Sequence, residues 1–379
     1  MLSTGKIAED ISKVAIRHGW ETYTAWGRFA KPSVSTQIQV GSKLDTYMHY
    51  AAHRLFDREG LMSNGATRKL VQRIEEIKPD IIHLHNIHDH YLNYPLLFEY
   101  LAKADIPVVW TQHDCWSFTG GCMYFDLLNC DAWKSGCINC PEKRAFLANS
   151  AEKQFRLKQE LLSQIKSLTF VPVSKWLAGL IKQSVQGHRD IITIHNGIDL
   201  TVFKPMRGAS SIKFNILGVA AVWHKRKGFD DFIKLREMLS EDFVITLVGL
   251  SPEQVKMLPP GIKGITRTSN LDEMVQLYSE ADVFVNPTYS DNFPTTNIEA
   301  LACGTPVITY KTGGSPEAVD TKTGVVIEQG NINALADAIM NMRDYPLSSE
   351  DCRKRAEDMF DKERCFEEYI DLYNKLLNK

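Results

Sequence analysis

The sequence predicts an α/β protein with two doubly wound domains, and three observations support this prediction. The chain has 379 residues, which is too long for one ordinary hydrophobic core and suits two. Short apolar runs alternate with segments of helical periodicity along most of the chain. These runs are continuous instead of alternating with polar residues, as is typical of parallel strands that helices cover on both faces.

Each half of the chain contains four such runs, which we interpret as strands. In the first half they are IIHLH (81–85), IPVVWTQ (106–112), LTFVPV (168–173) and IITIH (191–195). In the second half they are FNILGVAAV (214–222), FVITLVG (243–249), DVFVN (282–286) and PVITY (306–310). The intervening segment 229–239 places its apolar residues at helical spacing, so a helix is expected there.

The boundary between the domains is expected near HNGIDLTVFKP (195–205), which combines Asn-Gly and Lys-Pro turn signals with no periodicity. We therefore expect an N-terminal domain over 1–195 and a C-terminal domain over 196–360. The remaining tail, 361–379, carries an apolar stripe among charged residues and predicts an amphipathic helix. Because the stripe must be covered, we expect this helix to dock back on the N-terminal domain.

The start of the chain predicts a loop that leads into a helix. Residues 3–6 (Ser-Thr-Gly-Lys) are typical of a strand-to-helix loop, a helix would end at Gly19, and ETYTAW (21–26) would be the next strand. The strand before such a loop is usually central in a doubly wound sheet. We therefore expect the first strand of the N-terminal domain to be absent, and Gly5 is a candidate ligand-binding residue.

The composition excludes several classes of protein. A hydrophobic content of 44% and a charged content of 24% are ordinary for a soluble globular chain. The formal net charge of -2 provides no field that would attract nucleic acid. No segment resembles a secretory signal or a membrane span. A cytoplasmic protein with reduced thiols is expected.

Five of the eight cysteines lie in one segment, 115–141, which we interpret as an insertion after a strand. Cys122, Cys130, Cys137 and Cys140 have the spacing C-x7-C-x6-C-x2-C. Four thiolates suffice for tetrahedral zinc, and a reducing compartment favours a metal site over disulfides. A structural zinc ion is therefore predicted, and the alternative is four unligated thiols.

The segment 291–317 carries the clearest signs of a binding site. A predicted strand ends at Pro287, a polar loop follows, and a helix begins near Thr295 or Thr296. Ligands of open α/β sheets lie beyond the carboxyl ends of the strands, and helix N-termini attract phosphate oxygens. Glu299 is placed to accept hydrogen bonds from a ribose diol, and Asp291 to contact a sugar hydroxyl. A blander interpretation, in which Glu299 only caps its helix, leaves the rest of the run unexplained.

This segment resembles the family-4 retaining glycosyltransferases, whose GT-B fold has two facing Rossmann-like domains with a cleft between them. Their signature is Glu-x7-Glu followed by Ala-x-x-x-Gly-x-Pro-Val. The matching positions here are Asp291, Glu299, Ala300, Gly304, Pro306 and Val307, with Gly313, Gly314 and Glu317 after them. HNGIDLTVFKP (195–205) and Ser-Lys-Trp (174–176) also resemble family motifs, so the resemblance covers nearly the whole chain.

The resemblance implies roles for individual residues. Glu299 would bind the nucleotide of a nucleotide-sugar donor, Asp291 would contact the transferred sugar, and Lys227 would face the diphosphate. The further donor-binding residues that it implies are Gly5, Arg226, Asn292, Phe293, Thr295 and Thr296. His113 follows the strand VVWTQ and precedes an aspartate, as in the family's Thr-x-His-Asp, which places it beside the donor's sugar and α-phosphate. His85 and Asn86, at another strand end, are candidates for the acceptor side.

Two positions depart from the family pattern. Asp291 stands where the family has glutamate, so its carboxylate reaches one methylene less far. The family's second domain opens with Gly-Arg and then Lys-Gly, whereas here Ala-Ala-Val-Trp (220–223) precedes the basic loop that ends at Lys227. Arg226 or Lys225 is expected to replace the missing arginine, because Gly228 and a helix follow the loop.

A metal hydrolase is the alternative that the histidines suggest. Seven of the eleven histidines lie between 49 and 113, and HLHNIHDH (83–90) is close to His-x-His-x-Asp-His. The spacing fails because Ile87 stands where the second histidine is required. A hydrolase would also leave 291–317 unexplained.

The resemblance implies transfer of a sugar from a UDP- or GDP-sugar to a saccharide or lipid-linked saccharide, with retention of configuration. Basic groups would stabilise the leaving diphosphate, so no metal cofactor is expected for catalysis. Thr-x-His-Asp-Cys-Trp and Asp-Asn-Phe-Pro-Thr-Thr-Asn are similar to enzymes of capsular or exopolysaccharide synthesis of the colanic acid type. The alternatives are a nucleotide-sugar epimerase of the same fold and a catalytically silent sugar- or nucleotide-binding protein.

Peripheral contact with the inner face of the cell membrane would suit a lipid-linked acceptor. The basic residues that favour such contact surround a partly apolar helix and are Lys153, Arg156, Lys158 and Lys166. An ordinary surface helix is the alternative.

Overall fold

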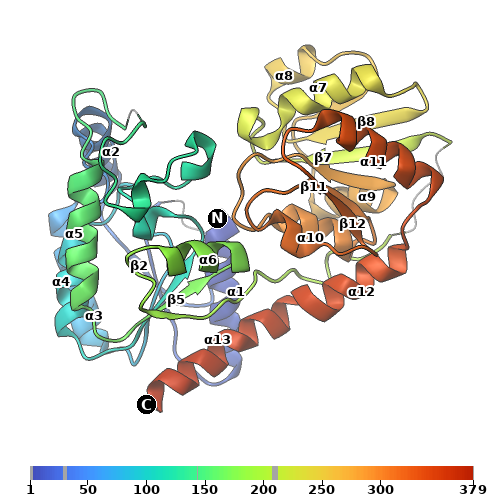
Figure 1. Cartoon of the computed structure of the whole chain (residues 1–379). Coiled ribbons are helices and arrows are strands. Elements are labelled where there is room, and N and C mark those ends of the chain that lie inside the picture. Colours follow the sequence, from blue (N-terminus) through green and yellow to red (C-terminus); the bar gives the residue numbers. More distant parts are fainter. Residues whose placement is uncertain (1–2, 29–31, 143, 207–211, 379) are drawn as a thin grey trace. The chain divides into compact units, whose positions relative to one another are not determined.

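The computed structural model describes residues 3–28, 32–142, 144–206 and 212–378 and divides them into two compact units (Figure 1). The first unit contains residues up to Ile194 together with Phe366 onward, and the second runs from His195 to Cys365. The boundaries expected from the sequence were 195/196 and 360/361. Each unit is an α/β structure with parallel strands, as expected for two Rossmann-like domains.

The strands of the first unit form two separate parallel sheets. One has the order β1-β2 and the other has the order β3-β4-β5-β6. The strands are β1 (Tyr23–Trp26), β2 (Thr36–Gln39), β3 (Ile82–Leu84), β4 (Val108–Gln112), β5 (Leu168–Pro172) and β6 (Asp190–Ile191). The helices are α1 (Ser3–Arg17), α2 (Lys43–Phe56), α3 (Asn64–Ile77), α4 (Tyr94–Lys103), α5 (Ala151–Gln164) and α6 (Lys175–Gln183). Three short 3₁₀ helices lie in the cysteine-rich segment: η1 (Trp116–Phe118), η2 (Phe125–Leu128) and η3 (Ala132–Lys134).

The second unit has one six-stranded parallel sheet in the order β12-β11-β10-β7-β8-β9. Its strands are β7 (Phe214–Val219), β8 (Phe243–Val248), β9 (Ile262–Ile265), β10 (Val283–Asn286), β11 (Val307–Tyr310) and β12 (Gly324–Ile327). Its helices are η4 (Lys225–Lys227), α7 (Phe229–Met238), α8 (Pro252–Lys256), α9 (Leu271–Glu280), α10 (Thr295–Ala302), η5 (Ser315–Ala318), α11 (Ile332–Asp344) and α12 (Ser349–Phe360).

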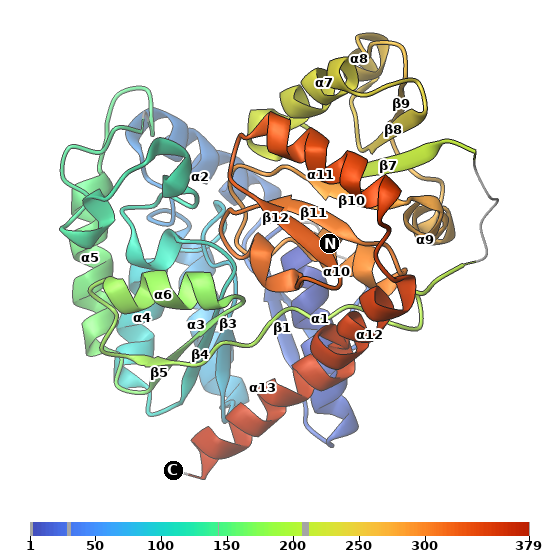
Figure 2. The same ribbon diagram turned by 45° about the vertical axis from the view of Figure 1, so that its right-hand side comes forward.

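The core of the second unit explains why its strands are continuously apolar. Figure 2 shows α7 and α11 side by side, and both contribute to one hydrophobic cluster with β7, β8 and β10. The helix α10 packs against α9 and α12. Ile245 and Phe284 are completely buried. Burying such side chains stabilises the fold by roughly 1.5–3 kcal/mol each before the conformational entropy is subtracted.

The tail 361–379 contains the single helix that the sequence predicted. α12 ends at Phe360, and α13 (Lys362–Leu377) begins after Asp361. The part of α13 from Phe366 onward belongs to the first unit, where Tyr373 is hydrogen-bonded to His83 (2.5 Å) and Tyr369 to Thr111 (3.0 Å). The apolar stripe of the tail is thus buried in the first unit.

The prediction of a loop at residues 3–6 is wrong. α1 begins at Ser3, so Gly5 lies in its first turn, and Thr4 Oγ1 accepts a hydrogen bond of 3.5 Å from Asn86. One of the basic residues predicted to favour membrane contact is not at the surface. Lys158 on α5 is completely buried and donates to the carbonyl of Trp116 at 2.5 Å. None of the helices among the described residues is both long and apolar enough to cross a membrane.

Candidate functional site

The carboxyl edge of the six-stranded sheet brings two loops together. β7 and β10 are hydrogen-bonded neighbours, so the loops that follow them leave the same edge of the sheet. The loop after β7 contains η4, and the loop after β10 leads to α10. The backbone N–H of Tyr289 donates to the carbonyl of Arg226 at 2.8 Å, and Arg226 Nη1 donates to the carbonyl of Ser290 at 2.7 Å. The two loops are therefore joined directly.

An ion pair joins Lys227 and Asp291 in the second unit. The sequence predicted that Lys227 contacts the donor's diphosphate and Asp291 its sugar. Their side chains are only 21% and 19% exposed, so water screens the pair less than it would at an open surface. Both residues lie at the carboxyl edge of the sheet, where ligands of doubly wound folds bind. The structure thus brings together the predicted diphosphate-facing lysine and the predicted sugar-facing carboxylate.

The N-terminus of α10 is open to an anion. Its N-cap position is Pro294, and within the described structure no side chain caps the helix. The backbone N–H of Asn297 donates to the carbonyl of Pro294 at 3.2 Å, so the first-turn amides of Thr295 and Thr296 are the ones that face outward. Such amides and the helix dipole favour negatively charged ligands.

Phe293 and Asn292, both predicted to bind the donor, are 5% and 4% exposed. The ring of Phe293 packs against His195 and Phe360, with centroid separations of 5.0 and 5.8 Å. Phe293 therefore anchors the loop through apolar packing. Its role toward a donor stays a prediction.

Glu299 has a partner that the sequence analysis missed. The hydroxyl of Tyr278 on α9 donates to Glu299 Oε2 at 2.9 Å. Tyr278 is completely buried, and burial, followed by the charge of Glu299, raises the pKa of its phenol well above the ordinary value. The phenol therefore remains a donor that fixes the orientation of the carboxylate. The aromatic stands twenty-one positions earlier in the chain, and no local pattern connects it to Glu299.

His195 and Glu317 form a second missed pair, at 2.9 Å between Nε2 and Oε2. The two side chains are 16% and 17% exposed. Glu317 lies on η5, just after the Gly-Gly pair of the signature. A histidine next to the interdomain segment carried no signal of its own in the sequence.

Gly313 holds the loop that carries Asp291. Its φ of +53° is in the left-handed region, and a Cβ added there would lie 1.8 Å from the carbonyl oxygen of Asp291. The neighbouring Gly314 N–H donates to the same oxygen at 3.3 Å. Only glycine permits this close approach.

In the first unit, His113 lies at the end of β4 with His85 beside it. His85 Nδ1 is hydrogen-bonded to His113 Nε2 at 3.0 Å. Burial lowers the pKa of His113 to about 4 and that of His83 to about 3, so these imidazoles are neutral near pH 7. A neutral His113 can donate a hydrogen bond to a ligand or accept one, depending on its tautomer.

Two histidines of the run 83–90 are held by neighbouring side chains instead of converging on one another. His83 uses Nδ1 toward Tyr373 and Nε2 toward Thr111, at 2.5 and 2.7 Å. His88 Nε2 pairs with Asp114 Oδ2 at 2.9 Å. Although burial opposes protonation of His88, Asp114 raises the pKa of the imidazole above its ordinary value. Asp114 directly follows His113 in the sequence, so its pairing with His88 fixes the end of β4.

The cysteines predicted to bind zinc line one cavity of about 20 Å³ in the first unit. They are Cys122, Cys130, Cys137 and Cys140. The N–H of Gly120 donates to Cys137 Sγ at 3.0 Å, the type of contact that stabilises a thiolate. Among the described residues, the group of metal-ligating side chains whose ligand atoms all lie within 4.8 Å of one another contains none of these cysteines. No three of the four sulfur atoms therefore lie that close together. Four thiols are suitable ligands for zinc, but their sulfur atoms are further apart here than the ligands of one ion. The zinc site stays a prediction.

The two α/β units with parallel sheets, and the Lys227–Asp291 pair beside the N-terminus of α10, agree with the glycosyltransferase class that the sequence predicted. The family model described as Glycosyltransferase Family 4 matches residues 9–202, and the one described as Glycosyl transferases group 1 matches residues 213–344. The chain therefore belongs to glycosyltransferase family 4. The predicted enzyme class and the predicted fold of two Rossmann-like domains are confirmed.

One relative resembles the chain over nearly its whole length, and another resembles part of it. It is 23% identical to the putative colanic acid biosynthesis glycosyl transferase WcaC of Escherichia coli K12, with 98% of this chain and 96% of that protein covered. It is 32% identical over 115 residues to the capsular polysaccharide biosynthesis glycosyltransferase CapM of Staphylococcus aureus, covering 29% of this chain and 30% of CapM.

Solved structures share the fold at low sequence identity. Sucrose-phosphate synthase of Thermosynechococcus elongatus has a TM-score of 0.74 at 17% identity, with 98% of this chain and 92% of that chain covered. Anabaena HepE, solved in complex with UDP, has a TM-score of 0.67 at 16% identity, with 98% and 96% covered.

Substitution of Gly313 by alanine should lower the rate of nucleotide release from a donor about a hundredfold, because the added methyl group displaces the Asp291 loop by an ångström or more. Gly330→Ala is the matched control, since its φ is also positive (+77°) but its nearest neighbour would be a tyrosine hydroxyl at 3.4 Å. Steady-state kinetics of both variants provide the measurement. Equal losses in both would contradict the proposed contact.

Stability should depend on pH through His113. Its folded pKa of about 4 lies below the ordinary value of 6.5. Between these values the unfolded chain binds a proton that the folded chain does not, so stability falls as the pH falls through this window. Between pH 6.5 and pH 4, the free energy of unfolding of His113→Gln should fall less steeply with pH than that of the wild type. The difference in slope corresponds to up to about one bound proton. His188→Gln, at an exposed site, should follow the wild type; parallel curves for all three proteins would refute the assignment.

Proposed function

We propose that the chain transfers a hexosyl unit from a UDP- or GDP-sugar to a saccharide acceptor with retention of configuration. The observation that carries the proposal is the Lys227–Asp291 pair at the sheet edge that also presents the N-terminus of α10. The printed names of WcaC and CapM, which refer to colanic acid and capsular polysaccharide, favour a role in cell-surface polysaccharide synthesis. The UDP-bound structure of HepE favours a nucleotide-sugar donor.

The proposed step forms a bond between an acceptor oxygen and the anomeric carbon and breaks the bond from that carbon to the donor's diphosphate. The acceptor proton moves to the leaving diphosphate oxygen. Lys227 and the first-turn amides of α10 stabilise the negative charge that develops there. Asp291 would hold a hydroxyl of the transferred sugar, and Glu299, oriented by Tyr278, would hold the ribose diol.

A panel of UDP- and GDP-sugars, assayed for nucleotide release with and without saccharide acceptors, tests the activity. Acceptor-dependent release supports transfer, a change in donor stereochemistry without acceptor indicates an epimerase, and binding without turnover indicates a silent binding protein. Lys227→Met should lower kcat about a hundredfold, because one stabilising group at the leaving charge is lost. Lys256→Met, at an exposed position of α8 in the same unit, is the matched control and should retain activity.

We further propose that the first unit contacts an anionic membrane surface, as a lipid-linked acceptor would require. α2 exposes Leu44, Tyr47 and Met48, which are 70%, 69% and 61% exposed. The strongly exposed Phe146 and Leu147 adjoin this helix, because their N–H groups donate to the carbonyls of Arg54 and Leu55. Large apolar side chains exposed along one helix are typical of helices that lie in a membrane interface.

Sedimentation with phosphatidylglycerol vesicles tests this contact. Met48→Glu should reduce the bound fraction severalfold, because a carboxylate is placed in the apolar patch and near anionic lipid. Met257→Glu introduces the same change at a more exposed site in the second unit, where Met257 is 80% exposed, and should bind as the wild type does. Equal binding by both variants would exclude α2 as the contact.

A further inference from the structure

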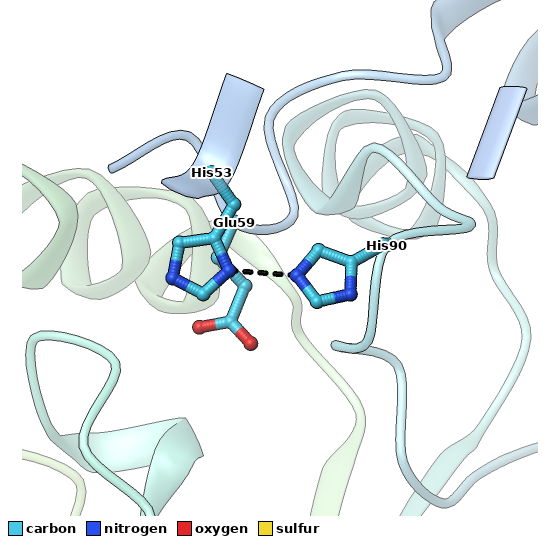
Figure 3. Close-up of side chains that lie close together, drawn as sticks. All are labelled: His53, Glu59 and His90. Carbon is cyan, nitrogen blue, oxygen red and sulfur yellow. Dashed lines mark hydrogen bonds between the residues drawn. The ribbon is translucent and has the colours of Figure 1, made fainter. Parts of the chain in front are cut away.

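Three side chains of the first unit that the proposed function does not use converge on one point. His53 comes from the last turn of α2, Glu59 from the loop after it, and His90 from the loop between β3 and α4. One ligand atom of each lies within 4.8 Å of the others. Figure 3 shows both imidazole rings and the Glu59 carboxylate pointing toward one another. Within the described ranges, no other group of metal-ligating side chains converges in this way.

The two imidazoles meet edge to edge. His53 Nδ1 and His90 Nε2 are 2.7 Å apart, so one nitrogen donates a proton to the other. Glu59 is 4% exposed and His90 8%, which shields their ligand atoms from water. Two ring nitrogens and a carboxylate therefore lie together in one place shielded from water. The hydrogen bond between the nitrogens contains one proton, which a metal ion would replace.

The loop that carries Glu59 is fixed from both sides. Asp57, completely buried, accepts from Arg144 Nε at 2.9 Å and from the N–H of Ser150 at 2.6 Å. The N–H of Gly60 donates to His49 Nε2 at 2.9 Å. Neighbouring groups thus hold the carboxylate in place before any ligand arrives, which reduces the cost of binding.

The backbone at His90 is held in an unusual conformation. Asp89 and His90 have φ values of 84° and 68°, in the left-handed region that side chains rarely adopt. This conformation turns Nε2 toward His53 and leaves Nδ1 3.5 Å from Asp89 Oδ1. A carboxylate beside the second nitrogen is the usual arrangement around a metal-bound histidine.

The surrounding charges favour a cation. Four carboxylates (Asp57, Glu59, Asp89, Glu142) and two guanidinium groups (Arg28, Arg144) lie around the histidines. With neutral imidazoles these six groups sum to -4 + 2 = -2, and the ammonium group of Lys158, which interacts with Glu59, adds at most one positive charge, so the surroundings stay negative. Arg144 is 3.8 Å from Glu59 and is bound more closely by Asp57, so the Glu59 oxygens keep room for a metal ion.

We propose that His53, Glu59 and His90 bind a divalent transition metal ion of the zinc type. Two imidazoles and one carboxylate are a set of ligands that zinc takes in proteins, with the fourth position left for water. Tetrahedral ligands at about 2.0–2.1 Å are about 3.3 Å apart, so the two rings would separate by about half an ångström. The ion would fasten the end of α2 to the loop between β3 and α4.

Titration of the chelator-treated full-length protein with Zn²⁺ and Co²⁺ tests the site. We expect the Co²⁺ spectrum of the wild type minus that of His90→Asn to show the visible bands of a tetrahedral ion without thiolate charge-transfer bands, because any ion bound by the cysteines contributes equally to both spectra. Zn²⁺ should raise the unfolding midpoint. His53→Asn and His90→Asn should each weaken binding by more than about tenfold and abolish the metal-dependent rise in midpoint. Asparagine is chosen at position 90 because it tolerates the left-handed backbone.

Two control variants separate this site from other metal binding. His188→Asn removes an exposed histidine of the same unit and should bind as the wild type does. Cys140→Ser removes a thiol of the cysteine cavity and should also leave this binding unchanged. Survival of the thiolate-free Co²⁺ bands in both ligand variants, or their loss only in Cys140→Ser, would overturn the proposal. The readouts are independent of transferase activity.

Discussion

The ion pair between Lys227 and Asp291 governs the geometry of the second unit's sheet edge. It joins two loops that leave neighbouring strands, and the backbone contacts of Arg226 and Gly313 hold both loops against it. The two charges neutralise each other in a partly shielded place. An incoming diphosphate and sugar hydroxyl would exchange this pairing for contacts of their own, so the charges need little new desolvation when a donor binds.

The first unit stabilises its connections with buried charges as much as with apolar contacts. Asp57 joins the end of α2 to Arg144 and Ser150, and Arg144 also lines the cysteine cavity. Burial lowers the pKa of Lys158 to about 7, and its ammonium group lies over the ring of Trp116 at 3.8 Å. These groups connect the cysteine-rich segment, the histidine group and β4. A long insertion without regular secondary structure can be ordered only by such specific contacts.

Much of the fold could be predicted because parallel strands buried on both faces are continuously apolar, as in β8 and β10. The strands that the patterns did not predict, β2, β9 and β12, lie at sheet edges, where one side of the strand has no neighbour and apolar content is not required. Asp291 and Glu299 were found because they share one local motif. Tyr278, His195 and the group around Glu59 were missed because each is assembled from distant segments. Gly5 was misplaced because a glycine near a helix start also fits a loop.

The second unit is inserted, in sequence, between the two parts of the first. Residues up to Ile194 and the last turns of α13 together make one unit, and α13 supplies Tyr369 and Tyr373 to the buried side of β3 and β4. During synthesis on the ribosome, the sheet that carries His83 and His113 must therefore wait for the final helix to emerge. The second unit can complete its folding before that point. The sheet of the second unit, which comes later in the sequence, can therefore be finished before the sheets of the first unit.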